Sequence, residues 1–236
     1  MAAALYAIPT PLGAAPAQAL PSDALETVRA LRDFVVENAK SARAFLSAVG
    51  MPCALRELRI EVLDEHTPSG AAIRALLEPL RHGRPLGLLS EAGCPAVADP
   101  GAALVEAAHR EGFRVVPLIG PSSIVLALMA SGLEGQRFAF CGYLPREAPA
   151  RERRIAELEQ RSQRERETQI FIETPYRNEA MLASLLKACA PATRLCVASD
   201  LTLAAETVQV CSIAQWRKSP PMPIGRRPSV FLMLAG

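Results

Sequence analysis

Two loops in the middle of the chain contain the residue types best suited to hold a ligand. Residues 90–101 include Ser90, Glu91, two glycines and Asp99, and residues 119–123 read Ile-Gly-Pro-Ser-Ser. A short apolar run enters each loop, and open α/β sheets bind ligands at the carboxyl ends of their strands. Glycine lets the backbone approach a ligand because it has no Cβ. Turn chemistry alone also produces such loops, so the residues by themselves leave both interpretations open.

Charged residues elsewhere provide weaker candidates for chemistry. Glu173 and Arg177 are four residues apart where a strand enters a helix, so they could line a substrate site or simply pair with each other. The segment 217–227 carries four cations and no acid, which suits either phosphate contacts or an ordinary basic loop. The charged helix expected at residues 151–167 mixes both signs and is typical of a solvated face.

Hydrophobic patterning predicts alternating strands and helices. We expect strands at residues 5–8, 34–36, 59–63, 86–89, 115–118, 138–143, 168–173, 195–198, 207–211 and 229–234. We expect helices from Ser22, over 39–49 and 71–81, from near Pro100, and over 122–131, 151–167 and 175–189. This alternation predicts βαβ units, a parallel sheet and an α/β fold class.

Composition narrows the function classes. The chain has 236 residues and a formal net charge of +2, enough length for two compact domains and too little charge to demand nucleic acid. No apolar run approaches the roughly 18 residues that span a bilayer, and residues 1–6 lack a basic signal region. We therefore expect a cytoplasmic protein that has no membrane partner.

The cysteines, histidines and glycines lack the spacings of well-known cofactor sites. The six cysteines form no CxxC pair, which predicts buried free thiols. They and the three histidines show no metal-ligand spacing, so we expect no metal. GxGxxG and P-loop patterns are absent, which leaves a dinucleotide or nucleoside triphosphate site unsupported.

Six segments in order resemble the tetrapyrrole methylase superfamily of S-adenosylmethionine (SAM) methyltransferases, in particular its branch of small-subunit ribosomal RNA ribose 2′-O-methyltransferases. Residues 5–13 match its opening strand and T-P-x-G turn, and residues 90–101 match its S-D-A-G-x-P…D-P-G loop. The remaining matches are V-V-P-x-P-G-P-S at 115–123, S-G-L…F-x-F-x-G-F-L-P at 131–145, F-Y-E-S-P-H-R at 171–177 and E-L-T-K…E at 200–206.

The resemblance implies two α/β domains of tetrapyrrole methylase type, residues 1–118 and 119–236, with SAM in a cleft between them and a homodimer as the usual assembly. By matched position, the SAM-binding candidates are Pro11, Gly13, Ser90, Glu91, Ala92, Gly93, Asp99, Gly120, Pro121, Ser122, Ser123, Tyr143 and Leu144. Glu37, Glu173 and Arg177 are the candidates for a catalytic role.

The chain departs from the branch pattern on the side expected to meet RNA. The A-E-D-T-R motif is Val-Glu-Asn-Ala-Lys at residues 36–40, and H-E-H-N is Asp-Glu-His-Thr at 64–67. Glu91 replaces an aspartate, and K-G-E before the last strand is Arg-Arg-Pro at 226–228. These changes keep three hypotheses open: an RNA methyltransferase, a small-molecule or tetrapyrrole methyltransferase, and a diverged relative that binds SAM without catalysis.

Overall fold

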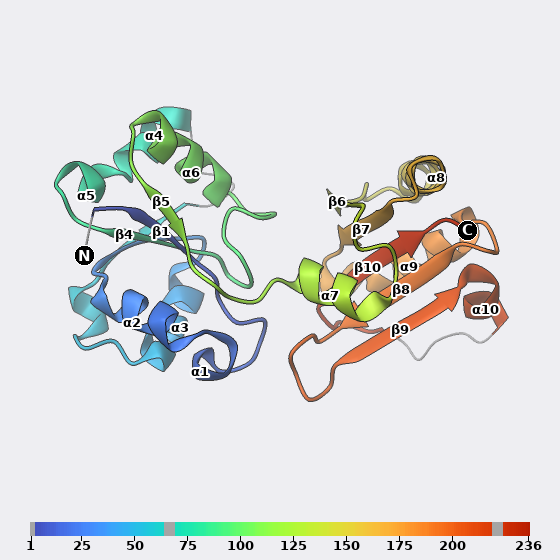
Figure 1. Cartoon of the computed structure of the whole chain (residues 1–236), viewed down its shortest axis with the longest axis horizontal. Helices are drawn as coiled ribbons and strands as arrows, with labels where there is room; N and C mark the ends of the chain where they lie inside the picture. Colours follow the sequence, from blue (N-terminus) through green and yellow to red (C-terminus); the bar gives the residue numbers. More distant parts are fainter. Residues whose placement is uncertain (1–2, 64–68, 219–223) are drawn as a thin grey trace. The chain divides into compact units, whose positions relative to one another are not determined.

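The chain divides into two compact units, residues 1–122 and 123–236 (Figure 1). The structure is a computed structural model that describes residues 3–63, 69–218 and 224–236. The division lies a few residues beyond the boundary expected after Leu118. The H-E-H-N counterpart at 64–67 and most of the proline-rich segment at 218–225 lie outside the described residues.

The first unit is a parallel α/β sheet. Its strands are β1 (Leu5–Ile8), β2 (Asp33–Val36), β3 (Arg59–Val62), β4 (Leu86–Leu89) and β5 (Val115–Pro117), in the order β3-β2-β4-β1-β5. Its helices are α1 (Pro16–Ala19), α2 (Ser22–Ala30), α3 (Ala39–Val49), η1 (Leu55–Glu57), α4 (Ser69–Ala75), α5 (Glu78–Arg81) and α6 (Gly101–Arg110). All pairings between these strands are parallel.

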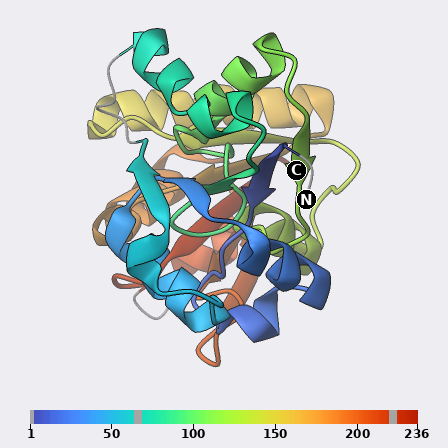
Figure 2. The ribbon, with the colours of Figure 1, turned by 90° about the vertical axis from the view of Figure 1, so that its left-hand side faces the viewer.

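Helices cover both faces of this sheet, as Figure 2 shows from the side of the first unit. The reason is visible in β2, where Phe34 and Val36 pack with α2 and α3 while Val35 packs with α5 and α6. Successive side chains of a strand point to opposite faces, so a continuous apolar run is buried on both sides. The arrangement leaves the loops after β1, β4 and β5 at one edge of the sheet, because the strands are parallel.

The second unit is a mixed sheet. Its strands are β6 (Phe138–Tyr143), β7 (Thr168–Ile172), β8 (Arg194–Ser199), β9 (Thr207–Ser212) and β10 (Ser229–Leu234), in the order β6-β7-β10-β8-β9. Its helices are α7 (Ser123–Ser131), α8 (Ala148–Glu165), η2 (Pro175–Arg177), α9 (Asn178–Ala188) and α10 (Ile213–Lys218).

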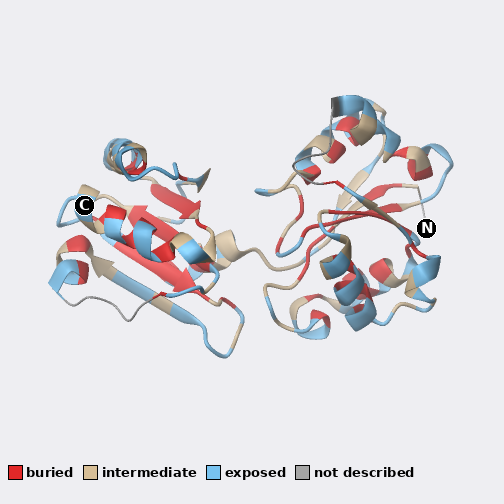
Figure 3. Cartoon of the chain, turned by 180° about the vertical axis from the view of Figure 1, so that it is seen from behind, coloured by how far each residue is buried: buried red, intermediate tan, exposed pale blue. Residues whose placement is uncertain are grey.

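The core of the second unit lies between the sheet and helices α8, α9 and α10 (Figure 3, red). Phe171 of β7 stacks on Phe231 of β10 with ring centroids 5.9 Å apart. Trp216 of α10 is 2% exposed and donates from its indole nitrogen to the Leu195 carbonyl at 3.0 Å. The polar end of this large buried ring is therefore satisfied.

The expectation of a parallel sheet is correct for the first unit and wrong for most of the second. Only β6 and β7 pair in parallel there, whereas β10 runs antiparallel to β7 and β8, and β9 runs antiparallel to β8. A short connection joins β8 to β9 without a helix. Such a connection cannot make the crossover that parallel strands require.

Two further expectations need correction. The helix expected at 71–81 is broken into α4 and α5, because Pro79 lies in the first turn of α5 and a proline cannot continue a helix from the preceding turn. All six cysteines are free, but only Cys189 and Cys196 are buried, and burial raises the pKa of each to about 12. No helix of the described segments is long and apolar enough to cross a membrane.

Candidate functional site

The loops after β1 and β4 are joined by a backbone bridge. The Thr10 amide donates to the Gly93 carbonyl at 2.9 Å, and the Gly93 amide donates to the Thr10 carbonyl at 3.0 Å. The hydroxyl of buried Ser90 donates to the same Gly93 carbonyl at 2.8 Å. Thr10 in turn donates its hydroxyl to the Ser90 carbonyl at 3.3 Å. These two loops are thus held in fixed register at the carboxyl edge of the first sheet.

Gly93 occupies a conformation that side chains disfavour. Its φ is +78°, and a Cβ there would lie 3.5 Å from Leu12 Cδ2 and 3.8 Å from the Pro121 carbonyl oxygen. The open side of Gly93 therefore faces the loops after β1 and β5. Gly13 has a φ of +135°, which also favours glycine.

Gly120 requires a glycine for a different reason, which is close packing. A Cβ at this position would come within 2.8 Å of Pro9 Cγ and 2.9 Å of Leu20 Cδ2. Close packing against the β1 loop is sufficient reason for a glycine here. Its side-chain position faces protein and not an open site.

Asp99 holds the second half of the β4 loop. Its Oδ1 accepts the amides of Ala96 and Gly101, each at 2.8 Å, so it ties the loop to the first residue of α6. Ala96 and Ala98 have positive φ values of 65° and 61°, an unfavourable backbone that these bonds help to hold. Burial raises the pKa of Asp99, while its two amide donors oppose that shift.

Two acidic residues, Glu37 and Glu91, meet where β2 and β4 end. The Glu91 amide donates to Glu37 Oε2 at 3.3 Å, and Ser41 donates its hydroxyl to Glu91 Oε1 at 3.3 Å. Asn38 caps α3 by accepting the amides of Lys40 at 2.9 Å and Ser41 at 3.3 Å. Acidic oxygens therefore flank the bridged loops, and they suit ligand hydroxyls or positive charge.

Most of the sequence-predicted SAM residues gather at this edge of the first unit. They are Pro11, Gly13, Ser90, Glu91, Ala92, Gly93, Asp99, Gly120, Pro121 and Ser122. The Cys94 thiol lies 3.5 Å from the Pro121 carbonyl and links the β4 and β5 loops. Ser123, Tyr143 and Leu144 belong to the second unit. Thr10 was not among the predicted residues, although its place in the T-P-x-G turn was a usable signal.

In the second unit, Glu173 and Arg177 form the local ion pair that was one of their two interpretations. Glu173 Oε1 accepts the Arg177 Nε at 3.0 Å and the Thr174 amide at 2.7 Å, and the Glu173 side chain is fully enclosed. Its Oε2 has no hydrogen-bond partner among the described residues, and neither has Asn178 Oδ1. This turn follows β7, beside the end of β6 where Tyr143 pairs with Ile172.

Arg217 and Arg227, two of the four cations considered for phosphate contacts, are already engaged in contacts within the protein. Arg217 donates to the carbonyls of Leu186 at 2.7 Å and Cys189 at 2.8 Å, so it caps the end of α9. Arg227 donates to Asp200 Oδ2 at 2.6 Å. Their guanidinium groups already serve structural contacts within the second unit.

Arg151 is an exception to the solvated face expected for the charged helix α8. It is 5% exposed, and it donates to Ser184 Oγ at 2.9 Å and to the Arg146 carbonyl at 2.6 Å. The periodicity of the helix places Arg151 on the inner face, but its charge made it look like a surface residue in the sequence.

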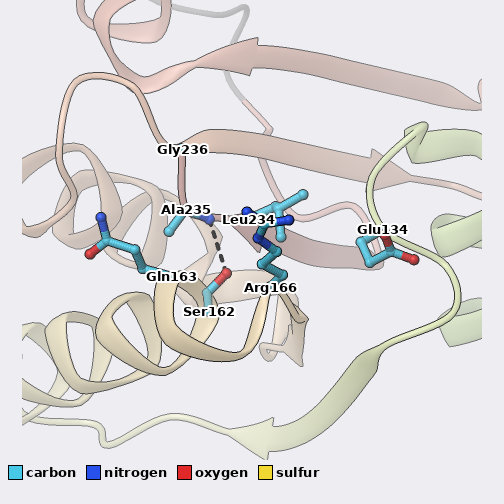
Figure 4. A pocket seen from close by; sticks show the side chains of 7 residues that line it. All are labelled: Glu134, Ser162, Gln163, Arg166, Leu234, Ala235 and Gly236. Atoms are coloured by element: carbon cyan, nitrogen blue, oxygen red, sulfur yellow. Dashed lines mark hydrogen bonds between the residues drawn. The ribbon is translucent and has the colours of Figure 1, made fainter.

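A hollow of about 410 Å³ lies at the opposite end of β7 (Figure 4). It is lined by Glu134, Ser162, Gln163, Arg166, Leu234, Ala235 and Gly236, and Ser162 Oγ accepts the Ala235 amide at 2.9 Å. It contains none of the predicted site residues. Among the residues that the structure describes, no group of three or more His, Cys, Asp or Glu side chains could hold a metal ion.

A family model described as Tetrapyrrole (Corrin/Porphyrin) Methylases matches residues 14–216. The chain belongs to this family. The methylase is 30% identical over 211 residues to the ribosomal RNA small subunit methyltransferase I of Vibrio cholerae, a match that covers 89% of this chain and 69% of the relative. The enzyme of the same name from Mesorhizobium japonicum is 34% identical over 199 residues, which cover 84% and 64% of the two chains.

Solved structures share the fold of this methylase. The methyltransferase CobJ aligns with a TM-score of 0.65 and 16% identity, covering 99% of this chain and 94% of that one. A diphthine synthase aligns with a TM-score of 0.66 and 16% identity, covering 98% and 89%. The expected α/β fold and methyltransferase class are confirmed.

Proposed function

We propose that this methylase transfers the methyl group of SAM to an oxygen of RNA, with small-subunit ribosomal RNA as the leading substrate. The observation that carries the proposal is the bridged edge of the first sheet, where Thr10 and Gly93 hold matched loops together. The names of the relatives at 30–34% identity support the RNA acceptor.

The residues at this edge fit the chemistry of SAM. SAM carries ribose hydroxyls, a positive sulfonium and an adenine, and the loops offer the Glu91 carboxylate, backbone groups and the space beside Gly93. When bound, SAM supplies a methyl group that is already electrophilic. The protein then has mainly to orient the acceptor oxygen and exclude competing water.

An alcohol acceptor also has to lose its proton. The Glu173 side chain is fully enclosed and paired with Arg177, so we infer that its carboxylate stabilises the turn that contains it. Glu37 is half-buried at the end of β2, beside the β4 loop. We therefore propose Glu37 as the general base that removes the proton from the hydroxyl that receives the methyl group, directly or through one water.

The small-molecule alternative rests on the fold shared with CobJ, and the third alternative retains SAM binding without transfer. Mass spectrometry of ribosomal RNA and metabolites from a deletion strain and its parent separates the three. Loss of one ribose methyl group from the small-subunit RNA supports the proposal. A lost methylated metabolite with unchanged RNA favours the small-molecule reaction, and no difference favours the diverged relative.

Assembly is a separate part of the proposal. The family resemblance implies a homodimer. Light scattering of the purified chain at several concentrations tests this, and a monomer at all of them contradicts it.

A further inference from the structure

Two of the three tyrosines of the chain are exposed at one edge of the second sheet. Tyr143 ends β6 and is 56% exposed, and Tyr176 lies in η2, just after β7, and is 66% exposed. β6 and β7 are parallel, with Tyr143 paired to Ile172, so their carboxyl ends meet at this edge. In a chain with 5% aromatic residues, an exposed ring at each of two adjacent strand ends calls for an explanation.

The turn that carries Tyr176 is held on both sides. Before it, Glu173 Oε1 accepts the Thr174 amide and the Arg177 guanidinium, and the Arg177 amide donates to the Thr174 carbonyl at 2.8 Å. After it, Asn178 Nδ2 donates to the carbonyls of Gly225 at 3.1 Å and Arg227 at 2.8 Å. Tyr176 is therefore an exposed ring on a backbone that needs no further ordering when a ligand binds.

The same turn contains both orphaned buried acceptors found among the described residues, Glu173 Oε2 and Asn178 Oδ1. Buried polar atoms without partners are costly, and they are expected where function requires a particular geometry. The loop after Tyr143 is held in a comparable way, since buried Arg151 donates to the Arg146 carbonyl. Both strand ends present their tyrosines from fixed supports.

We propose that Tyr176 is a stacking platform for an unpaired nucleobase of the acceptor RNA. This inference rests on the proposed function. An exposed aromatic ring on a rigid support binds any base by its face, and single-stranded RNA is recognised largely in this way. Tyr143 matches a SAM position in the family and is not part of the new assignment. Adenine of SAM is the other possible source of a base, and the test separates the two.

The test compares Tyr176→Ala with Tyr176→Trp and with Phe138→Ala. Phe138 is a matched control because it is a 43% exposed aromatic residue at the opposite end of β6. The probes are a fluorescently labelled single-stranded RNA of mixed sequence and the same strand in a duplex, both at one fixed salt concentration. Anisotropy gives RNA affinity, calorimetry gives SAM affinity, and thermal unfolding confirms that each variant is folded.

Tyr176→Ala should weaken single-strand binding by about 5- to 150-fold, the range for loss of one stacked base, with unchanged SAM affinity. Tyr176→Trp should retain binding, Phe138→Ala should match the parent, and the duplex should bind weakly to all. In methylation assays, the KM for RNA should rise while kcat stays near the parent value.

Two results overturn the platform alone: single-strand affinity unchanged in Tyr176→Ala, or an equal loss in Phe138→Ala. A loss of SAM affinity in Tyr176→Ala assigns the ring to the cofactor instead. A parent protein that binds SAM but neither binds nor methylates RNA overturns the proposed substrate, and the platform with it.

Discussion

Substitution of Gly93 by valine tests whether the bridged loops are the SAM site. Gly93 has a φ of +78°, and Gly112, in an exposed turn of the same unit, has a φ of +75° with nothing within 4 Å of its Cβ position. Both positions impose the same backbone strain on a side chain. Only position 93 directs the side chain toward Leu12 and the Pro121 carbonyl, among the matched loops.

The strain alone should not affect binding. A left-handed backbone costs a residue with a Cβ about 1–2 kcal/mol, against a typical stability of about 5–15 kcal/mol. About 99% of molecules or more then remain folded, so Gly112→Val should lower the melting temperature and leave SAM affinity at the parent value. Gly93→Val should lower both the melting temperature and the SAM affinity, because the valine side chain would enter the space that we propose SAM fills. Such crowding costs about 1–3 kcal/mol, or roughly 5- to 150-fold in Kd.

Titration calorimetry with SAM gives the affinity of each variant, and thermal unfolding of the same preparations gives its stability. A folded Gly93→Val protein that binds SAM as tightly as the parent removes Gly93 from the site. Equal losses of affinity in the two variants would show that general destabilisation, and not position, is responsible. Repeating the titration with protein treated with a chelator tests the expectation that no metal is required.

Three further outcomes follow from individual contacts. Glu37→Gln should lower kcat by about 10²- to 10⁴-fold while SAM affinity persists, as expected for loss of a general base, and unchanged kcat would exclude that role. Charge reversal at Arg226, which is exposed, should weaken RNA binding in a salt-dependent way without loss of stability. Charge reversal at Arg227 should lower the melting temperature, because it breaks the ion pair with Asp200. Equal effects of the two substitutions on stability would contradict this. Because the pKa of Asp99 is raised in the fold, its neutral form is favoured, and its contribution to stability is present in acid and lost as pH rises from about 4 through the raised pKa. Asp99→Asn keeps the acceptor oxygen and should flatten that dependence in thermal unfolding across this pH range, and an unaltered profile would refute the assignment.

The sequence predicts the centre of the first unit well because β2 and β4 are short runs that are buried on both faces. Leu86–Leu89 follows Gly83-Arg84-Pro85 and ends at Ser90, and Asp33–Val36 ends at the polar pair Glu37-Asn38. The second unit resists the same reasoning. The β8–β9 connection is too short for a crossover, and β10 lies antiparallel to both of its neighbours, β7 and β8. Hydrophobic periodicity carries no information about strand direction.

Site residues are less predictable than strands, for two physical reasons. A glycine required for packing, such as Gly120 against Pro9, has the same letter as one that leaves space beside a ligand, such as Gly93. A buried charge such as Arg151 looks like a surface charge until its carbonyl partners are known. Both distinctions depend on contacts between residues far apart in the chain.

The departures from the family pattern near Glu37 are compatible with an unchanged backbone. Asn38 caps α3 through Oδ1 as an aspartate would, since both residues accept amides equally well at this position. Glu91 meets Glu37 through its backbone amide, so the longer side chain does not alter that contact. What changes is charge: an amide at residue 38 removes a negative group beside Glu37 and Glu91. The substitutions therefore preserve the loops proposed to hold SAM and lower the repulsion that an approaching phosphate would meet.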